Sequence, residues 1–441
     1  MTRRWLALGA PLALVAVQQQ LLLHQPPRLE QLQQSATSKG PAALTLQFSR
    51  PMNRASVADA SRLDPALPVR WLGSGNRLSL SLEQGTTIQG PLSLQLGGND
   101  QRATALRPTR WRWDPRPRVL AVVDAGGGEQ LQLQQADGRW QALSPVWAKI
   151  EAVEPLGDGS AVVLVSRTRN NRLQILRIPL RQRNLAPSDA GLGPVQAGPP
   201  QRLAQGDMVF AHLSSNNRGD LLIQQGGFEP DSAVTTLWPR GQVTRRLPLQ
   251  ASGPMRLLPQ GGAVVVPASD GLQLHDLPPR PPRQQTLPGS RDLSSFCPRA
   301  GRALLVRHWP DFRRSLELVE PGQPPRQLWI GPQAVVASSC SGSGDRLWLA
   351  LVDGVQRPQL TLLALDRRGR VLARRRLIGL ELEPGTPLSY DPSRHQLLLV
   401  LRPWGRGSKP APAAQVMLVD GTTLAPRALG KQARLALWLA P

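Results

Sequence analysis

The chain has 441 residues, 40% of them hydrophobic, and it contains 44 proline and 40 glycine residues. This length exceeds one ordinary hydrophobic core, so we expect two domains, or one large closed repeat with a small module. The formal charge of +23 comes almost entirely from arginine, and it predicts a surface that attracts anions. Aromatic residues make up 4% of the chain, and its 12 tryptophans are scattered. Stacking platforms for bases therefore lack support, which argues against a nucleic-acid partner.

Residues 1–24 have the pattern of an export signal. Arg3 and Arg4 precede an apolar run from Trp5 to Val17, and Leu21–Leu23 extends this run beyond three glutamines. A basic region followed by an apolar one is typical of secretory signals. An uncleaved signal anchor and a cleaved signal peptide both stay open, because the segment approaches membrane-spanning length. With an anchor, the chain is held in the cell envelope and its bulk lies in the periplasm or elsewhere outside the cytoplasm.

Residues 25–41 are rich in glutamine and proline, and we expect them to form a poorly ordered linker. From residue 42 to 114 the chain alternates short apolar and polar positions, as in Leu44–Ser49, Arg77–Leu82 and Leu92–Leu96. This period of two predicts half-buried strands, and the glycine and asparagine turns between them predict a small β-sandwich.

The same region resembles a known family. Phe48-Ser49-Arg50-Pro51-Met52 matches the F-[ST]-x-P-M signature that opens bacterial Ig-like domains of the S-layer (SbsA-like) type. The resemblance continues through Val57, Pro65–Trp71 and the turn Gly97–Asp100, and it departs from the family pattern at Asp100–Ala103. It implies an Ig-like envelope module over residues 42–114, which spaces and presents a neighbouring domain and has no catalytic role.

From residue 115 to 441 a polar, glycine-containing turn recurs before a run of leucine and valine. Successive copies lie roughly 40 to 60 residues apart, the spacing expected of four-stranded propeller blades. The copies begin at Gly157, Asn217, Gln260, Arg299, Gly342 and Pro392. We therefore predict an all-β chain whose larger part is a β-propeller of about seven blades. Its hairpin pattern resembles the degenerate blades of TolB-like and related periplasmic propellers.

Closure of such a ring requires the two ends of the repeat region to share a blade. We expect the last strand-like run, Arg434–Leu439, to pair with the first, Arg118–Val123. Three proline-rich insertions interrupt the repeat, and we expect them to form surface loops or short extended segments. They are Asn184–Gln201, Pro278–Gln285 and Pro403–Ala414.

The two cysteines, Cys297 and Cys340, precede the recurring turn at matching positions of consecutive repeats. Matching positions in neighbouring blades can lie close enough for a disulfide, if the Cα atoms are less than about 7 Å apart. Two buried, unpaired thiols are the other possibility. A zinc site is not predicted, because no second cysteine or histidine lies at ligand spacing.

Catalytic and cofactor motifs are missing from the sequence. The five histidines occur singly, and no G-x-S-x-G elbow, phosphate-binding loop or calcium loop is present, so no catalytic residue, cofactor or metal is predicted. The aspartates near the recurring turns are expected to bond their own backbone. His395 lies in one such turn, where we expect it to be exposed to solvent.

Arginines gather around one hairpin near residue 370, and they form the possible basic surface of the chain. They are Arg367, Arg368, Arg370, Arg374, Arg375 and Arg376. Neighbouring side chains of a strand point to opposite faces, so this group divides between two surfaces. A solvated surface, or one that faces an anionic membrane, is the expected role.

Together these features predict a non-enzymatic binding or scaffold protein of the cell envelope. Its propeller would hold a partner, either an envelope protein or a glycan, at one face. The alternative is a propeller hydrolase or lyase that acts on an acidic polysaccharide or other glycan, with carboxylates or arginines in the central channel. Converging charged side chains in a deep channel pocket would favour the enzyme, and a channel lined by small and apolar residues would favour binding.

Overall fold

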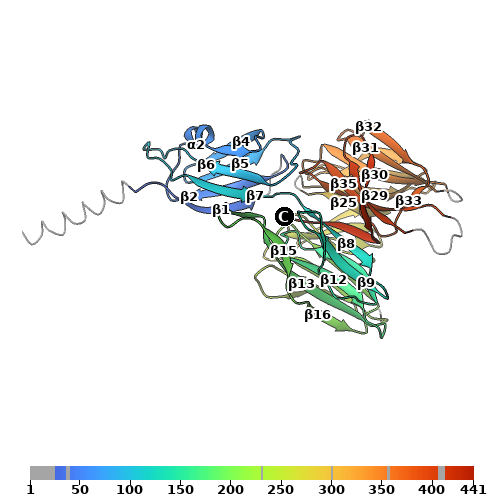
Figure 1. Cartoon of the computed structure of the whole chain (residues 1–441). Coiled ribbons are helices and arrows are strands. Elements are labelled where there is room, and N and C mark those ends of the chain that lie inside the picture. The colour runs from blue at the N-terminus through green and yellow to red at the C-terminus, as the bar shows by residue number, and fades with distance from the viewer. Residues whose placement is uncertain (1–24, 36–39, 230–231, 299–300, 355–357, 406–412) are drawn as a thin grey trace, which may run out of the picture. The chain divides into compact units, whose positions relative to one another are not determined.

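The computed structural model describes residues 25–35, 40–229, 232–298, 301–354, 358–405 and 413–441 (Figure 1). The described chain is built of β-strands, with one short α-helix, α2 (Arg54–Ala60), which confirms the all-β prediction. It divides into two compact units. The first comprises the described residues up to Thr86, Gly90–Asp114 and Asn184–Leu192, and the second comprises Thr87–Gln89, Pro115–Arg183 and Gly193–Pro441.

The first unit contains two four-stranded antiparallel sheets. One has the order β1 (Leu29–Ser35), β2 (Ala43–Phe48), β5 (Arg77–Leu82), β4 (Val69–Ser74). The other has the order β14 (Leu185–Pro187), β7 (Thr109–Trp113), β6 (Leu92–Leu96), β3 (Arg62–Asp64). Alternate residues of both sheets are fully buried, among them Leu44, Leu80, Leu94 and Trp113. The apolar residues of the predicted two-residue alternation therefore form the core of this unit.

The F-S-x-P-M segment is part of that core. The side chains of Phe48 and Met52 are buried, and Asn53 caps α2 by accepting hydrogen bonds from the backbone N–H groups of Ala55 and Ser56. A short polar side chain at this position satisfies donors that the first helical turn leaves free. The spacing of the motif thus has a local physical reason: two buried anchors are followed by a helix cap.

One expectation for the connecting segments was wrong. The supposed linker 25–41 contains β1, which pairs with β2 from Ser35 opposite Ala43 to Leu29 opposite Phe48. The insertion Asn184–Gln201 contains short extended segments, one of the two forms expected for it: β14 pairs with β7 in the first unit, and β15 (Gly193–Ala197) pairs with β13 in the second. In the insertion that starts at Pro278, a strand begins only at Gln284.

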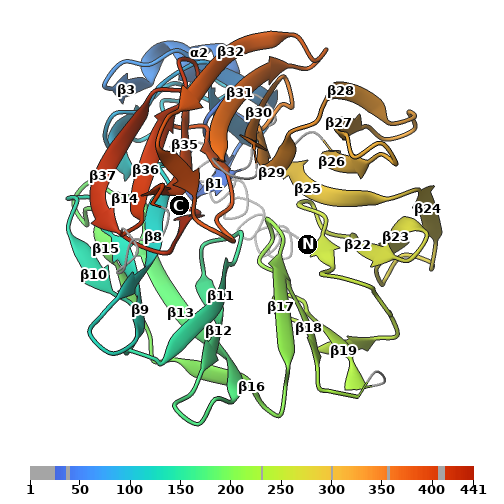
Figure 2. The ribbon, with the colours of Figure 1, turned by 90° about the vertical axis from the view of Figure 1, so that its right-hand side faces the viewer.

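The second unit consists of seven antiparallel sheets among its described residues, arranged around a centre in Figure 2. The first, from its outer strand inward, is β10 (Trp140–Ala142), β9 (Glu129–Gln134), β8 (Arg118–Asp124), β38 (Leu435–Leu439). The second, from its inner strand outward, is β11 (Lys149–Pro155), β12 (Ala161–Arg167), β13 (Leu173–Arg183), β16 (Gln201–Gly206), and β15 pairs with the far part of β13.

The next three blades run from inside to outside in chain order. Blade three is β17 (Phe210–Ser215), β18 (Leu221–Gly226), β19 (Val234–Trp238), β20 (Arg245–Leu247). Blade four is β21 (Arg256–Leu257), β22 (Ala263–Ala268), β23 (Gly271–Asp276), β24 (Gln284–Pro288). Blade five is β25 (Arg291–Cys297), β26 (Arg302–His308), β27 (Arg314–Val319), β28 (Arg326–Gly331).

The last two blades follow the same order. Blade six is β29 (Ala334–Cys340), β30 (Arg346–Asp353), β31 (Gln359–Asp366), β32 (Val371–Leu377). Blade seven is β33 (Leu380–Leu382) and β34 (Ser389–Asp391), both paired with β35 (Gln396–Pro403), then β36 (Gln415–Asp420), β37 (Pro426–Gln432). Five four-stranded and two five-stranded antiparallel sheets around a centre confirm the predicted β-propeller.

The recurring turn connects the first and second strands of a blade. A glycine with positive φ stands there in five of the copies, for example Gly159 (φ +69°) and Gly344 (φ +74°), because this backbone conformation is strained for residues with a Cβ. His395 takes the corresponding place in the last copy, with φ +54°. The apolar run that follows becomes the second strand, buried on both faces between neighbouring blades, as in β12.

The ring closes as predicted. Strand β38 pairs antiparallel with β8, with Leu435 opposite Val122 and Leu439 opposite Arg118. The first blade is therefore made of strands from both ends of the repeat region, which removes the free edges that an open ring would leave at its two ends.

The predicted signal anchor or signal peptide, residues 1–24, lies outside the described residues. Within the described part of the chain, no helix has the length and apolar character that crossing a membrane requires.

Candidate functional site

The direction of the strands separates two edges of the propeller. Neighbouring strands in a blade are antiparallel, so the turns between strands one and two and between strands three and four lie at the same edge. The starts of strands one and three and the end of strand two lie at the opposite edge. The innermost strands, such as β11, β17, β25 and β29, lie nearest the centre in Figure 2.

A cavity of about 880 Å³ opens among the inner strands of blades five, six and seven. Its wall is formed by the first half of β25, the first half of β29 and the segment between β33 and Leu388. The apolar part of the lining includes Leu293, Val335, Val336, Ala337, Leu382 and Leu388. The polar part includes Arg256, Asp292, Ser294, Ser295, His308, Arg314, Ser338, Glu381, Glu383 and Thr386. The lining is thus mixed, and this volume lies in the range of small-ligand sites.

Matching β-bulges shape the cavity wall. The register of β25 against β26 shifts between Leu293 and Ser295, and that of β29 against β30 shifts between Val335 and Ala337. Each bulge adds one unpaired residue, Ser294 in β25 and Val336 in β29, and both line the cavity. Strand β11 carries a bulge at the equivalent place, between Ile150 and Ala152. The bulges therefore turn extra side chains toward the channel.

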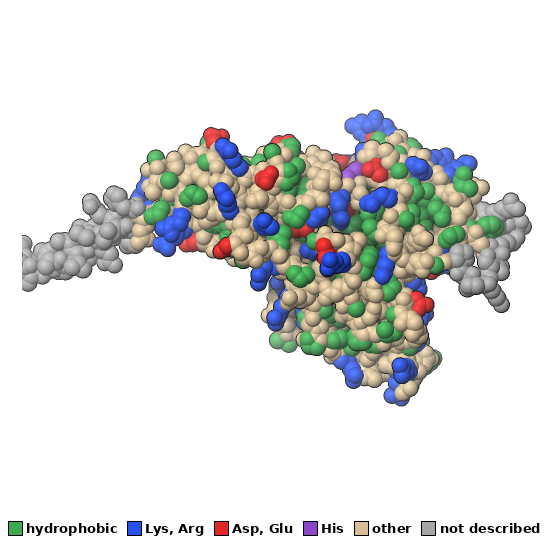
Figure 3. All heavy atoms as spheres, in the orientation of Figure 1, with side chains coloured by type: hydrophobic (Ala, Val, Ile, Leu, Met, Phe, Trp, Pro, Cys, Tyr) green, Lys and Arg blue, Asp and Glu red, His purple; other side chains and the backbone are tan. Residues whose placement is uncertain are grey.

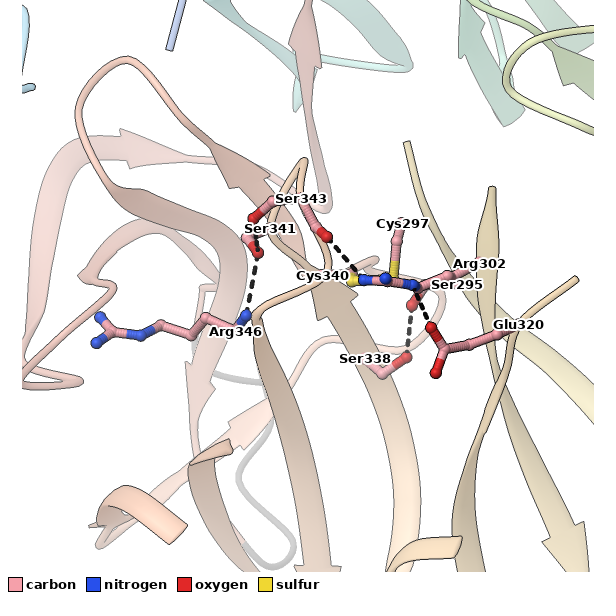
Figure 4. The surroundings of a disulfide bond; sticks show 9 residues. All are labelled: Ser295, Cys297, Arg302, Glu320, Ser338, Cys340, Ser341, Ser343 and Arg346. Atoms are coloured by element: carbon pink, nitrogen blue, oxygen red, sulfur yellow. Dashed lines mark hydrogen bonds and ion pairs between the residues drawn. A yellow bond between two sulfur atoms is a disulfide. The ribbon is translucent and has the colours of Figure 1, made fainter. Parts of the chain in front are cut away.

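Three serines form a hydroxyl network on this wall. The Ser295 and Ser338 hydroxyls lie 2.7 Å apart (Figure 4). The Ser338 hydroxyl also donates to the Ser294 hydroxyl at 2.7 Å. In the structure Cys297 and Cys340 form a disulfide, with their Cα atoms 4.9 Å apart. Each cysteine follows a networked serine by two residues, so serine and cysteine share a strand face. The disulfide therefore fixes the spacing of the two inner strands that carry the network.

Paired side chains occupy the charged part of the cavity lining. Arg402 lies 2.5 Å from Glu381 and 3.6 Å from Glu383. Asp292 lies 2.6 Å from the Nε2 atom of His308. The carboxylates at the cavity are thus engaged with neighbouring basic side chains, and they flank the apolar wall.

A second charged group lies on the inner strands of blades two to four. Glu154 of β11 accepts a hydrogen bond of 2.7 Å from the backbone N–H of Ser215, and Arg256 of β21 donates to the Leu213 carbonyl at 3.3 Å. Burial raises the pKa of Glu154 to about 7, although the nearby charge of Arg256 opposes this shift. Burial and the same arginine lower the pKa of His212 in β17. Arg256 also lines the cavity, so this group adjoins it.

Some arginines of the predicted basic surface are paired with carboxylates, and others are not. Arg367 binds Glu320 at 2.7 Å and Arg370 binds Asp366 at 2.6 Å. Arg374, Arg375 and Arg376 are exposed on β32, the outer strand of blade six, and have no carboxylate partner among the described residues. Figure 3 shows basic side chains gathered where Figure 1 labels β32. Charged residues on an outer strand also prevent edge-to-edge pairing with another chain. Arg368 contributes its backbone N–H to the Asp366 carboxylate.

Three of the turn aspartates behave as expected, and His395 does not. Asp124, Asp158 and Asp391 accept hydrogen bonds from backbone N–H groups two residues further on. His395 is half-buried rather than exposed, because its ring lies against Tyr390, whose hydroxyl is 2.7 Å from Nδ1. Arg346 donates to Nε2 at 2.9 Å.

Sequence reasoning did not find the cavity residues, which come from separate repeats and meet only at the centre of the ring. One signal was available: Ser295 and Ser338 stand at the same distance before the two cysteines. Within the described ranges, no group of three or more histidine, cysteine, aspartate or glutamate residues is placed to hold a metal ion.

The chain is similar to solved structures at low sequence identity. TolB from Acinetobacter baumannii matches over 67% of this chain and 78% of its own, with 14% identity and a TM-score of 0.41. The β-propeller domain of the Trilobed protease from Pyrococcus furiosus matches over 79% of this chain and 94% of its own, with 10% identity and a TM-score of 0.45. No protein-family model and no curated protein matches the chain. The propeller assignment rests on the seven sheets and their closure.

Proposed function

We propose that this chain is a non-enzymatic binding or scaffold protein of the cell envelope, whose propeller holds a segment of a partner protein in the cavity of blades five to seven. The observation that carries this proposal is the cavity wall itself. Leu293, Val335, Val336 and Ala337 form an apolar strip beside the serine hydroxyls, and the disulfide fixes the strands beneath it. An apolar surface with a few oriented polar groups is typical of binding pockets.

The partners of the cavity carboxylates support binding over catalysis. Glycoside chemistry needs two carboxyl groups that face the scissile bond, one of them free to give a proton. Glu381 and Glu383 are both engaged by Arg402, and Asp292 is engaged by His308. These carboxylates are suited to orient a bound segment at the rim of the apolar strip.

Location in the envelope has two supports. Residues 1–24 have the pattern of an export signal, and Cys297 and Cys340 form a disulfide, a bond that persists in oxidising compartments outside the cytoplasm. We propose that the first unit is an SbsA-like Ig-like spacer, because Phe48 and Met52 of the F-S-x-P-M motif are buried anchors of its core. An anchored chain would then present the propeller outside the cytoplasm.

A matched pair of substitutions tests the binding proposal. Val336→Arg places a charge on the cavity wall, and Val371→Arg places the same charge on the outer strand β32; both valines are exposed, at 44% and 59%. We expect immobilised wild-type protein to retain a specific protein from an envelope extract of the organism that makes it. Val336→Arg should abolish retention and Val371→Arg should preserve it. Equal retention by both variants would contradict a role for the cavity.

The alternative, a hydrolase or lyase acting on an acidic glycan, has one observation in its favour. Burial raises the pKa of Glu154 to about 7, and Arg256 and His212 lie on neighbouring inner strands. A general acid or base beside an arginine that neutralises substrate charge would have this arrangement. The test is depolymerisation of uronic-acid polymers by wild-type protein and by Glu154→Gln. Cleavage that disappears in the variant would favour the enzyme, and absence of cleavage in both would favour binding.

A further inference from the structure

A second hollow, of about 630 Å³, lies between blades three and four, at the edge of the propeller opposite to the cavity. It is bounded by turns that connect strands one and two and strands three and four of these blades, so it belongs to the edge that carries the recurring turns. Its floor is apolar and is made by Leu237, Leu257 and Leu277.

Four arginines surround this hollow: Arg218, Arg240, Arg245 and Arg280. The described lining contains one carboxylate, Asp220, and both of its oxygens are engaged. The Asn216 side-chain amide donates to Oδ2 at 2.7 Å, and the backbone N–H of Arg240 donates to Oδ1 at 2.9 Å. Asp220 thus serves to hold the turns together, and the arginines dominate the charge of the hollow.

Two of the arginines are held in place by neighbouring acidic residues. Arg240 forms an ion pair of 2.9 Å with Asp158 from blade two, whose side chain is buried against Gly219. A Cβ on Gly219 would lie 2.5 Å from that carboxyl group, so the close packing requires glycine there. Arg280 lies over Gly262 and is 3.8 Å from Asp276. Both arginine side chains stay more than half exposed, so their guanidinium groups are accessible at the rim.

The other two, Arg218 and Arg245, have no carboxylate partner within the described part of the chain. A guanidinium group binds phosphate, sulfate and carboxylate through paired N–H donors. Arg218 and Arg245 thus have no carboxylate partner among the described residues, and the paired Arg240 and Arg280 lie beside them. Four guanidinium groups around one hollow suit a ligand that carries more than one negatively charged oxygen.

We propose that this arginine-lined hollow binds an acidic saccharide through its phosphate, sulfate or carboxylate groups. The concave shape suits one or two sugar units rather than a flat membrane surface. Aromatic side chains are missing from the described lining, so the site lacks the stacking partners that single-stranded nucleic acid uses. The site is separate from the cavity, and its occupancy does not depend on the proposed partner protein.

The test compares two double variants that remove the same charge. Arg218→Ala with Arg245→Ala changes the hollow, and Arg374→Ala with Arg376→Ala changes the exposed outer strand β32. Binding of a sulfated tetrasaccharide and of an oligogalacturonate is measured by calorimetry at 50 and 300 mM NaCl, with inorganic phosphate as the free-ion probe. We expect at least one saccharide to bind, and the hollow variant to lose at least ~10-fold in affinity while the β32 variant loses less than ~2-fold.

A further variant guards against loss of folding. Gln242 lines the hollow and is exposed, so Gln242→Glu adds a negative charge without removing a contact from the core. It should weaken saccharide binding by a similar factor and leave thermal unfolding unchanged. Equal losses in the hollow and β32 variants, no binding of either saccharide by wild-type protein, or binding of inorganic phosphate as tight as that of the saccharides would overturn the proposal. Val336→Arg, which blocks the cavity, should leave saccharide binding unchanged, so the two sites can fail separately.

Discussion

The guanidinium group of Arg434 binds both carboxylate oxygens of Glu129, at 2.7 and 3.0 Å, although the two residues are 305 positions apart in the chain. Glu129 also accepts a hydrogen bond of 2.7 Å from the backbone N–H of Ile150, and Arg434 donates to the Ile150 carbonyl. The pair therefore joins the last strand of the chain to blades one and two, and it reinforces the pairing of β38 with β8.

Replacing Arg434 with alanine should destabilise the closed ring. The variant leaves a largely buried carboxylate with one hydrogen bond fewer on each oxygen, and we expect a loss of about 1–3 kcal/mol in the free energy of unfolding. Urea unfolding followed by tryptophan fluorescence measures this loss. Arg434→Lys keeps the charge but not the paired hydrogen bonds, so its free energy of unfolding should lie between those of wild type and Arg434→Ala. Unchanged unfolding of Arg434→Ala would show that strand pairing alone closes the ring.

The disulfide should contribute strongly to the stability of blades five and six. It closes a loop of 43 residues, and the entropy of such a loop in the unfolded chain corresponds to about 4 kcal/mol. The double variant Cys297→Ser, Cys340→Ser should therefore unfold at lower temperature than wild type, and a reducing agent should lower the melting temperature of wild type alone. If the reducing agent lowers the melting temperatures of wild type and the double variant equally, the disulfide is not the cause of the shift.

Glu154 predicts a dependence of stability on pH. Its pKa rises from the ordinary 4.5 to about 7 on folding, so its carboxyl group is protonated in the folded state at pH 5 and ionised at pH 8. A raised pKa means that folding is favoured at low pH and that this contribution disappears as the pH rises through 7. Glu154→Gln should therefore stabilise the protein more at pH 8 than at pH 5, by at most ~3 kcal/mol.

The matched control is Glu151 on the same strand. Burial would raise its pKa, but hydrogen bonds from Arg167 and Lys149 outweigh this effect and lower it. Glu151 is thus ionised at both pH values, and Glu151→Gln should change the free energy of unfolding by the same amount at pH 5 and pH 8. A pH-independent effect of Glu154→Gln would contradict the raised pKa.

His395 predicts a loss of stability in mild acid. Burial and the charge of Arg346 lower its pKa below 6.5, with Asp420 opposing, so the folded protein holds the neutral ring. The contribution of a lowered pKa is present above pH 6.5 and decreases as the pH falls below it. The free energy of unfolding should fall less between pH 7 and pH 5 in His395→Gln than in wild type. An identical slope in both proteins would show that the Tyr390–His395–Arg346 contact does not control the protonation.

Most of the propeller could be predicted from the sequence, because each blade repeats the same local signals. A turn with a glycine in the left-handed conformation and an apolar second strand recur from Gly159 to Gly344, and closure by Arg434–Leu439 follows from the need to remove edges. Strand β1 was missed because Leu29–Ser35 has only two apolar residues and lies at a sheet edge, where backbone hydrogen bonds determine the structure. Strand β14 was missed because Leu185–Pro187 is too short to show a period.

The sites were less predictable, because side chains from separate repeats converge on them. Ser295 and Ser338 lie 43 positions apart in the chain. Their hydroxyls come into contact only because the inner strands of two neighbouring blades lie side by side in the closed ring. Arg218 and Arg280 come from neighbouring blades and share a hollow for the same reason. Local patterns specify which residues occupy a blade position, but they do not specify which positions of different blades face a common space.

Strand β14 makes the two compact units inseparable by a single cut in the gene. Ending a fragment near residue 114 would leave the outer side of β7 without its partner Leu185–Pro187, and starting one at residue 115 would carry that partner away with nothing to pair. The sheet that contains β7 is completed only when the chain has been synthesised past residue 187, after strand β13 of blade two. Fragments intended to isolate either half should therefore expose an uncovered strand and aggregate, and biochemical work calls for the chain from residue 25 onward as a single piece.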